Sequence, residues 1–332
     1  MRVAYQEIIQ NLEKILLKNG FTEDRAKLCS ILFTQASLDG VASHGLDRFP
    51  VFLEMIRKKL VLPNQEASIL DSYGVFERWN GNLGPGPLNA YQCMDRAIQI
   101  SKELGVGIVA LQNTNHWMRA GNYGWQAAEA GCIGICFTNT KPNMPAWGGS
   151  EPKLGNNPLV IAIPHSDGHI VLDMAMSQFS YGKLKTYLRE GKEMPFDAGF
   201  DADGNLTKSP ESVIANELAL PVGLWKGAGL SLLLDMLATI LSGGKSTFQV
   251  GESGEEFSLS QVFICLDAEK IGIKEWSEEK LDAIISDLQS SSTFVGSEIR
   301  YPGGKIPEIR KQNMEHGIPV DEKIWKSIIK EL

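Results

Sequence analysis

Residues 106–111 read VGIVAL and residues 132–137 read CIGICF, two short apolar runs rich in branched side chains. Leu159–Ile163 and Ile170–Leu172 have the same character, and polar residues bound all four runs. Such runs are typical of strands that are buried on both faces of a sheet. A helical pattern over Tyr123–Ala130 separates the first two runs. The sequence therefore predicts a mixed α/β core built on a buried sheet.

The residues before this core have helical rather than strand periodicity. Residues 5–19 place their apolar side chains on one stripe, and a second helical pattern follows over residues 22–37. A third helix is expected to begin just after His44, because Pro50 fits only the first turn of a helix. The beginning of the chain is thus predicted to be helical.

Helices and strands are also expected further along the chain. Leu62–Phe76 reads as a transition, and the turn-rich loop Gly81–Pro87 precedes a helix over Leu88–Leu104. Ala228–Leu241 is apolar almost throughout and predicts a buried helix that is too short to span a bilayer. Phe257–Leu266 alternates in polarity and predicts a further strand.

The C-terminal part of the chain is polar and has helical patterns. They predict a helix capped at Ser277 and another over Asp321–Leu332, which could fold back onto the N-terminal helices. We therefore expect two domains. Residues 1–72 and 275–332 would form a mostly helical domain, and residues 73–274 an α/β core.

The composition is that of a globular protein and argues against several classes of partner. The chain has 332 residues, 43% of them hydrophobic, which fits about two domains. A net charge of -8 argues against nucleic acid and membrane surfaces as partners, although a local basic pocket can still bind an anionic metabolite. No apolar stretch resembling a secretory signal follows Met1, so a cytoplasmic protein is expected. The five cysteines predict free thiols, and no residue spacing predicts a metal site.

Several common motifs of nucleotide-binding and hydrolytic enzymes do not occur. The sequence contains no Rossmann fingerprint, no Walker A sequence, no GxSxG elbow and no HExxH. The glycines of Gly81–Gly86 follow no clear strand, and Pro85 and Pro87 remove amides that could bind a phosphate. A Rossmann dehydrogenase and the usual hydrolases are therefore excluded.

Polar residues at the ends of the predicted strands are candidates for a ligand site. His116 follows the first strand, Asn139 the second, and Asp173 the fourth, where ligand crevices form in α/β cores. Lys226 enters the long apolar helix beside two glycines and could bind a phosphate. Taken alone, each residue also has a structural explanation. His116 could be a buried histidine whose ring bonds the backbone, and Asn139 and Asp173 could be turn or cap residues. Lys226 could lie at a solvated helix end. Similarly, His165, His169 and His316 read as surface residues.

The stretch Ser43–Arg48 joins a titratable imidazole to a fixed cation. His44 can exchange a proton near neutral pH, and Arg48 can grip a carboxylate with two hydrogen bonds. Together they suit a small organic acid whose carbonyl or hydroxyl changes its protonation state. By itself the stretch favours a helix entry with a surface arginine over a catalytic role. Only the other candidate residues shift the interpretation toward catalysis.

A set of motifs along nearly the whole chain resembles the malate/L-lactate dehydrogenase family that lacks a Rossmann fold. Within it, the chain is most similar to the branch that reduces a diketo sugar acid. The motifs are Ser43-His44-Gly45 with Arg48, Asn115–Arg119, Tyr123–Ala128, Gly134–Cys136 with Thr138-Asn139, Met144-Pro145 with Trp147-Gly148, Asn157–Leu159, Asp173-Met174, Phe179–Gly182, Gly199–Asp201 with Gly204–Thr207, and Trp225–Gly227.

The resemblance implies an NADH-dependent reductase of a 2-keto acid. His44 would donate the proton, and Arg48 would hold the substrate carboxylate, with Ser43 and His116 close to the reacting carbonyl. A hydride arriving at a carbonyl carbon leaves an alkoxide, which needs a positioned acid. The partner is thus a small anionic keto acid. The family likeness also implies a homodimer with the active site near the subunit contact.

The resemblance further implies where the coenzyme binds. The contacts would come from two strand ends, a helix entry and a C-terminal turn: Asn139, Thr140, His169, Ile170, Val171, Leu172, Asp173, Met174, Ala175, Trp225, Lys226, Gly303, Gly304 and Lys305. Lys305 stands where the family commonly has a Glu, so the coenzyme contacts at this turn would differ. Lys141 could shift the coenzyme preference from NADH toward NADPH.

Two alternatives to this function are kept. One is a reductase of another 2-keto or cyclic imino acid within the same family, of the malate, lactate or ureidoglycolate type. Met118-Arg119 stands where family members usually have a Gly and favours the diketo sugar acid branch. The other is a binding or assembly protein that has the fold without the catalysis.

Overall fold

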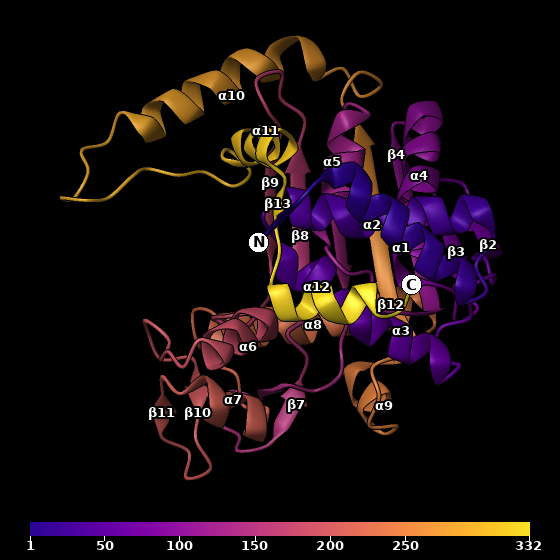
Figure 1. Ribbon diagram of the computed structural model, residues 1–332. Coiled ribbons are helices and arrows are strands. Elements are labelled where there is room, and N and C mark those ends of the chain that lie inside the picture. Colours follow the sequence, from indigo (N-terminus) through magenta and orange to yellow (C-terminus); the bar gives the residue numbers. More distant parts are fainter.

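A seven-stranded sheet forms the centre of the molecule in the computed structural model, which describes all 332 residues (Figure 1). In spatial order the strands are β2 (Ser68–Tyr73), β3 (Phe76–Asn80), β4 (Val106–Thr114), β12 (Leu259–Asp267), β5 (Cys132–Thr138), β8 (Leu159–Ile163) and β9 (Ile170–Met174). Neighbouring strands are antiparallel except β3 and β4, which are parallel. The predicted mixed α/β core and its five predicted strands are confirmed.

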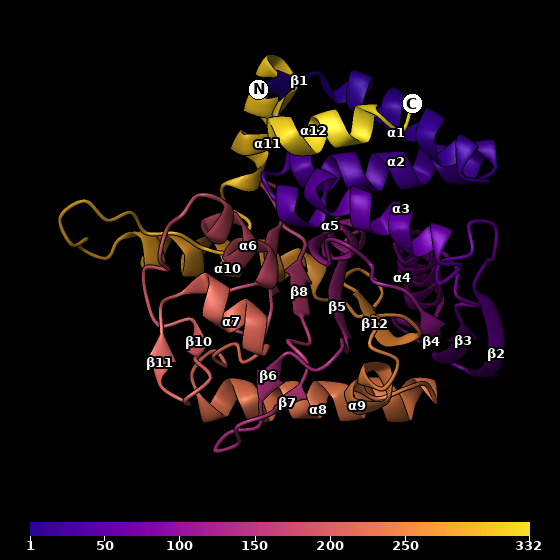
Figure 2. The same cartoon turned by 60° about the horizontal axis from the view of Figure 1, so that its bottom comes forward.

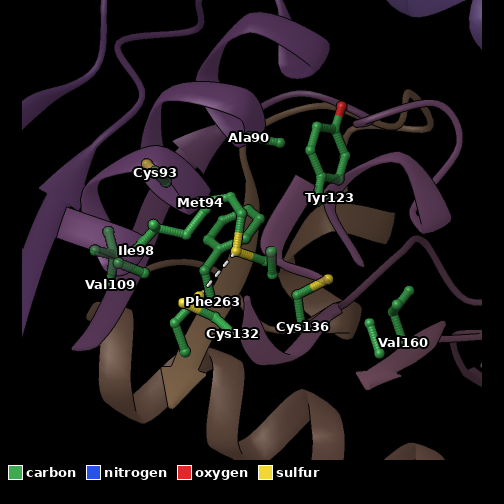
Figure 3. Close-up of a cluster of buried hydrophobic side chains, with 14 of the residues drawn as sticks. Ala90, Cys93, Met94, Ile98, Val109, Tyr123, Cys132, Cys136, Val160 and Phe263 are labelled. Atoms are coloured by element: carbon green, nitrogen blue, oxygen red, sulfur yellow. Dashed lines mark hydrogen bonds between the residues drawn. The ribbon is translucent and has the colours of Figure 1, made fainter. Parts of the chain in front are cut away.

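Helices cover both faces of the sheet. On one face α4 (Gly86–Leu104) and α5 (Gly121–Glu129) enclose a large apolar cluster, which contains four of the five cysteines as free thiols. Figure 3 shows how densely these side chains pack, with the Cys265 thiol 3.3 Å from the sulfur of Met94. On the other face α8 (Trp225–Ser242) packs over β12 and its neighbours, with α9 (Thr247–Gly251) at its end.

The two ends of the chain build a helical layer together. It contains α1 (Tyr5–Lys18), α2 (Glu23–Leu38), α3 (Phe49–Arg57), α11 (Ile306–His316) and α12 (Glu322–Ile329). A short antiparallel pair of β1 (Arg2–Val3) and β13 (Ile318–Pro319) joins the two termini, so the C-terminal part folds back as predicted. Figure 2 shows this layer on one side of the strands and α8 with α9 on the other.

A smaller lobe follows β9. It contains α6 (Tyr181–Arg189) and α7 (Pro210–Asn216), together with the short pairs β6 (Met144–Pro145) with β7 (Pro152–Leu154) and β10 (Gly199–Phe200) with β11 (Leu206–Thr207). Helix α10 (Lys274–Gln289) lies apart from the body in Figure 1 and has no buried residue. Its contacts include the turn between β8 and β9, where the Ser166 amide donates to Glu278. None of the helices combines the length and hydropathy needed to cross a membrane.

Four details of the predicted secondary structure are wrong. The chain forms two 3-10 turns, η1 (Ala42–His44) ending at His44 and η2 (Leu46–Arg48) after it, before α3 begins at Phe49. The transition before Phe76 holds β2, which begins at Ser68, before the expected domain boundary. The glycine loop does follow a strand, β3. Helix α10 begins three residues before Ser277, whose hydroxyl bonds the Lys274 carbonyl inside the helix.

The expectation that α8 is buried is also wrong. Its inner face packs on the sheet through Ala228, Leu234 and Ala238. Its outer face leaves large apolar side chains exposed: Trp225, Leu230, Leu232, Leu233, Met236, Leu237 and Ile240. Apolar residues all around a helix predict that something covers both sides, and a single chain covers only one.

Candidate active site

One cavity of about 770 Å³ lies where the helical layer, the sheet and the small lobe meet. Its volume falls within the range of roughly 300–1,000 Å³ common for small-molecule sites. Residues from η1 and η2, from the loop after β4, from β9 and from α6 border it. Ser43, His44, Arg48 and His116 all border this cavity, although they come from distant parts of the chain.

The helical layer delivers His44 on a short turn. Gly45 separates η1 from η2, and the Leu46 amide just after it donates to the Ser37 hydroxyl on α2 at 3.0 Å. The Ser43 hydroxyl lies 3.1 Å from Nδ1 of His44. This hydrogen bond fixes the imidazole, and the other ring nitrogen remains for a ligand.

The loop after β4 holds His116 in a constrained conformation. Asn113 and Met118 both have positive φ angles, of 53° and 64°, which cost energy in residues other than glycine. The amide of Asn115 donates to carbonyls of the preceding glycine loop, which anchors the turn. At Gly86 a Cβ would come within 2.2 Å of the His116 carbonyl, so only glycine permits this close packing. The glycine loop therefore supports the loop that carries the histidine.

The two imidazoles lie close together with nearly parallel rings. Their centroids are 6.1 Å apart with an interplanar angle of 21°. Nδ1 of His116 accepts a hydrogen bond from the Met118 amide at 3.0 Å. A neutral His116 must therefore carry its proton on Nε2.

Burial lowers the pKa of both histidines, but their charged neighbours differ. The pKa of His44 is lowered first by burial, while the carboxylate of Asp173 raises it and the cations of Arg48 and Arg119 lower it. The pKa of His116 lies well below its ordinary value because of burial, Arg48 and His44, and no acidic group opposes these effects. His44 is thus the imidazole better suited to gain and lose a proton.

Carboxylates hold the two arginines beside the histidines. Arg48 donates through one Nη to Glu256 at 3.1 Å, which leaves other donors of its guanidinium for a ligand. Arg119 donates to the fully buried Asp39, which also accepts from Arg310 at 3.0 Å. The guanidinium of Arg310 in turn stacks 4.3 Å from the ring of Trp125. Asp39 therefore connects α2, the His116 loop and α11.

The structure divides the predicted coenzyme residues into two groups. Six border the cavity: Thr140, Val171, Leu172, Asp173, Ala175 and Gly303. Eight do not: Asn139, His169, Ile170, Met174, Trp225, Lys226, Gly304 and Lys305. Asp173 accepts from the Gly121 amide at the start of α5 at 2.8 Å. The Val171 amide bonds the Pro302 carbonyl, which brings the C-terminal turn to β9.

Several residues outside the cavity have structural partners. Asn139 is fully buried, and its amide bonds Asp235 on α8 at 2.9 Å. The ring of His169 lies 5.3 Å from that of Trp125, and Lys305 pairs with Glu298. Trp225 and Lys226 lie on α8, across the sheet from α4 and α5, and Trp225 is 62% exposed. These two residues do not border the cavity of their own chain.

The prediction that His165 lies at the surface is wrong. Its side chain is only 4% exposed, and Nε2 lies 3.0 Å from Asp282 on α10. The charged partner lies 117 residues further along the chain, and no pattern in the sequence connects the two positions.

Sequence reasoning missed several side chains that border the cavity, among them Tyr181, Lys185, Arg189 and Glu256. The first three lie on one face of α6. Their helical spacing was a signal that could have been found, because positions i, i+4 and i+8 share a face. Glu256 lies in the acidic loop after α9 and had no such signal.

Comparisons with known proteins agree along the whole chain. The family profile described as "Malate/L-lactate dehydrogenase" matches residues 3–329. A 2,3-diketo-L-gulonate reductase from Pasteurella multocida is 42% identical over 330 residues, which cover 99% of each chain.

Solved structures have the same fold. The crystal structure of malate dehydrogenase from Entamoeba histolytica matches with a TM-score of 0.93 and 27% identity, covering 100% of this chain and 97% of the other. A Δ1-piperideine-2-carboxylate reductase from Pseudomonas syringae matches with a TM-score of 0.90 and 25% identity, covering all of both chains. The expected family and its non-Rossmann fold are confirmed. The chain is an oxidoreductase that belongs to the malate/L-lactate dehydrogenase family.

Proposed function

We propose that the protein reduces 2,3-diketo-L-gulonate to 3-keto-L-gulonate with NADH, transferring a hydride to the C2 carbonyl. The observation that carries this proposal is the placement of His44 and Arg48 together in one cavity, with Asp173 near enough to raise the pKa of His44. The named relative that is 42% identical over almost the whole chain supports the choice of substrate.

His44 supplies the proton in this reaction. The bound reduced nicotinamide supplies the hydride. As negative charge develops on the carbonyl oxygen, the imidazolium of His44 donates its proton to that oxygen and becomes neutral. Ser43 keeps the ring oriented, and Nε2–H of His116 provides a second donor near the same oxygen. Arg48 holds the substrate carboxylate through the donors that Glu256 leaves unused.

The residues around the cavity suit a pyridine nucleotide. Asn143 borders the cavity, and its side-chain oxygen is buried without a hydrogen-bond partner. An unpaired acceptor of this kind fits the amide group of a nicotinamide. We propose that Thr140, the strand Val171–Ala175 and the turn at Gly303 hold the rest of the coenzyme. NADPH remains the alternative, with Lys141 as the residue that would favour it.

We also propose that the enzyme is a cytoplasmic homodimer in which α8 contributes to the contact. The apolar outer face of α8 supports a second copy as its cover. Trp225 and Lys226 lie outside the cavity of their own chain, so any contact with the coenzyme would be made in the partner's cavity. The predicted division into a helical domain and an α/β core would put His44 on the helical domain and most of the proposed coenzyme contacts on the core.

Substitution at the exposed face of α8 tests the dimer. Leu233→Glu should shift the protein toward monomers in sedimentation, whereas Ile284→Glu on the exposed face of α10 should not. An unchanged assembly in the Leu233 variant refutes the role of α8.

A panel of substrates tests the proposed activity. The purified protein should oxidise NADH with 2,3-diketo-L-gulonate faster than with pyruvate, oxaloacetate or Δ1-piperideine-2-carboxylate. Preference for the cyclic imino acid would select the second candidate, which the structural match to a Δ1-piperideine-2-carboxylate reductase supports. If the protein oxidises no NADH with any of these compounds, a binding function replaces the enzymatic one.

A further inference from the structure

Five cationic side chains border the cavity: Arg48, Arg119, Lys141, Lys185 and Arg189. Four of them have a carboxylate partner. Arg48 pairs with Glu256, Arg119 with Asp39, Lys141 with Glu217, and Arg189 with both Asp47 and Asp321. Lys185 alone has neither an ion pair nor a hydrogen bond. An unpaired cation in a partly desolvated cavity costs free energy unless a ligand supplies the opposite charge.

The packing of α6 brings Lys185 toward the His44 turn. At Gly182 a Cβ would come within 2.7 Å of the Ser43 Cβ, so the helix backbone lies directly against η1. Lys185 follows almost one helical turn later on the same side. Burial lowers the pKa of its ammonium, and the nearby cations of Arg48 and Lys141 lower it further, while Glu256 raises it. Lys185 and Arg48 therefore face the same part of the cavity.

We propose that Lys185 is a second substrate-binding cation, which holds the carboxylate of the 2-keto acid together with Arg48. This inference rests on the proposed reduction of a keto acid. The carboxyl carbon is bonded directly to the carbonyl carbon that His44 serves, so the carboxylate must lie within a few ångströms of the His44 turn. Arg48 has donors left beside its bond to Glu256, and Lys185 adds a point charge from α6 in the same part of the cavity.

A phosphate of the coenzyme is the other anion that could meet Lys185. The two sources differ in what a substitution changes. Loss of a carboxylate contact raises the KM for the acid, whereas loss of a phosphate contact weakens the binding of NADH. A neutral methyl ester of the same keto acid separates the two further, because it lacks the charge that Lys185 would bind.

Lys185→Met, with Lys183→Met as its matched control, tests the proposal. Lys183 lies on the same helix but does not border the cavity, and its ammonium lies 5.2 Å from the Phe179 ring centroid. We expect Lys185→Met to raise the KM for the acid about 10- to 100-fold, the usual effect of a lost charged hydrogen bond. Its KM for the ester and its dissociation constant for NADH should not change. Lys185→Arg should recover part of the loss.

Other outcomes overturn the proposal. A weaker affinity for NADH with an unchanged KM for the acid assigns Lys185 to the coenzyme, and equal effects in both Met variants make it a surface residue. Thermal melting shows whether each variant is folded. If the wild-type protein reduces no keto acid, the proposed function fails independently of the role of Lys185. Calorimetric titration of the wild type and both Met variants with oxalate still measures whether Lys185 contributes to anion affinity. Binding weakened in Lys185→Met but not in Lys183→Met supports an anion contact, and unchanged binding refutes it.

Discussion

The His44 turn and the His116 loop each bring an imidazole to the same cavity, but they hold it in different ways. His44 comes from the helical layer on a turn with one side-chain hydrogen bond, and Asp173 acts on its charge. His116 comes from the sheet on a loop with two positive φ angles, and its Nδ1 is occupied by a backbone amide. The comparison teaches that burial and neighbouring cations together hold the pKa of an imidazole low. A nearby carboxylate and a free nitrogen are what make it suitable as an acid.

The largest effect is expected at the C-terminal end of α2, just before the His44 turn. There Asp39 pairs with Arg119 of the His116 loop and with Arg310 of α11. Asp39→Ala should lower the free energy of unfolding by about 3–5 kcal/mol, because it leaves the buried guanidinium of Arg119 without its carboxylate partner. Denaturant titration measures the change, with Asp71→Ala, which removes an exposed pair with Arg78, as control. A loss below about 1 kcal/mol would mean that water replaces the carboxylate.

Replacing each histidine separately tests the assigned roles. His44→Ala should lower kcat by about 100-fold or more while NADH still binds, because the proton donor is gone. His116→Ala should lower kcat by less than His44→Ala does, since it removes a neutral donor and leaves the acid in place. Single-turnover kinetics with bound NADH measure both. The assignment is reversed if the His116 variant loses more activity than the His44 variant.

Arg48 acts on the substrate from the His44 side. Arg48→Lys keeps the charge but loses the planar fork, so the KM for the keto acid should rise about 10-fold or more with a smaller change in kcat. Steady-state kinetics with the preferred acid check this. A KM equal to that of the wild type would show that Arg48 does not bind the substrate carboxylate.

The smallest effect concerns pH. Because burial lowers the pKa of His44, its protonated form predominates in the free enzyme only below the ordinary value of about 6.5. The kcat/KM for reduction should therefore fall as pH rises through a midpoint below that value. Asp173→Asn should move the midpoint lower, since the carboxylate raises the pKa, and Arg48→Met should move it higher. Midpoints that do not move in opposite directions contradict the electrostatic difference between the histidines.

Much of the fold followed from periodicity, because each element depends mainly on its own residues. The strands Val106–Thr114 and Cys132–Thr138 were found because apolar runs of that length are buried on both faces. Strand β2 was missed because its residues are mostly exposed at the sheet edge and have no apolar pattern. The start of α3 was misplaced because Pro50 limits where a helix begins but does not exclude 3-10 turns before it.

The site was less predictable because its chemistry depends on contacts between distant segments. His44 and Arg48 could be named from one motif and a family resemblance. The partner of Arg48 lies 208 residues away in a loop without a pattern, so its hydrogen bond could not be foreseen. Asn139 was a candidate for the ligand site from its place after a strand, and the sequence did not show that its amide bonds a carboxylate on α8. The position of a residue after a strand does not specify on which face of the sheet its side chain finds a partner.

The strand order has a consequence for how the protein is made. Strand β12 lies between β4 and β5, yet it follows both by more than a hundred residues in sequence and ends at Asp267. Until it emerges from the ribosome, the sheet can exist only as two three-stranded halves, β2-β3-β4 and β5-β8-β9, each with an open edge. The nascent chain must keep these edges from pairing with other chains while most of its length is synthesised. A single late strand thus makes folding of the whole core a largely post-translational event.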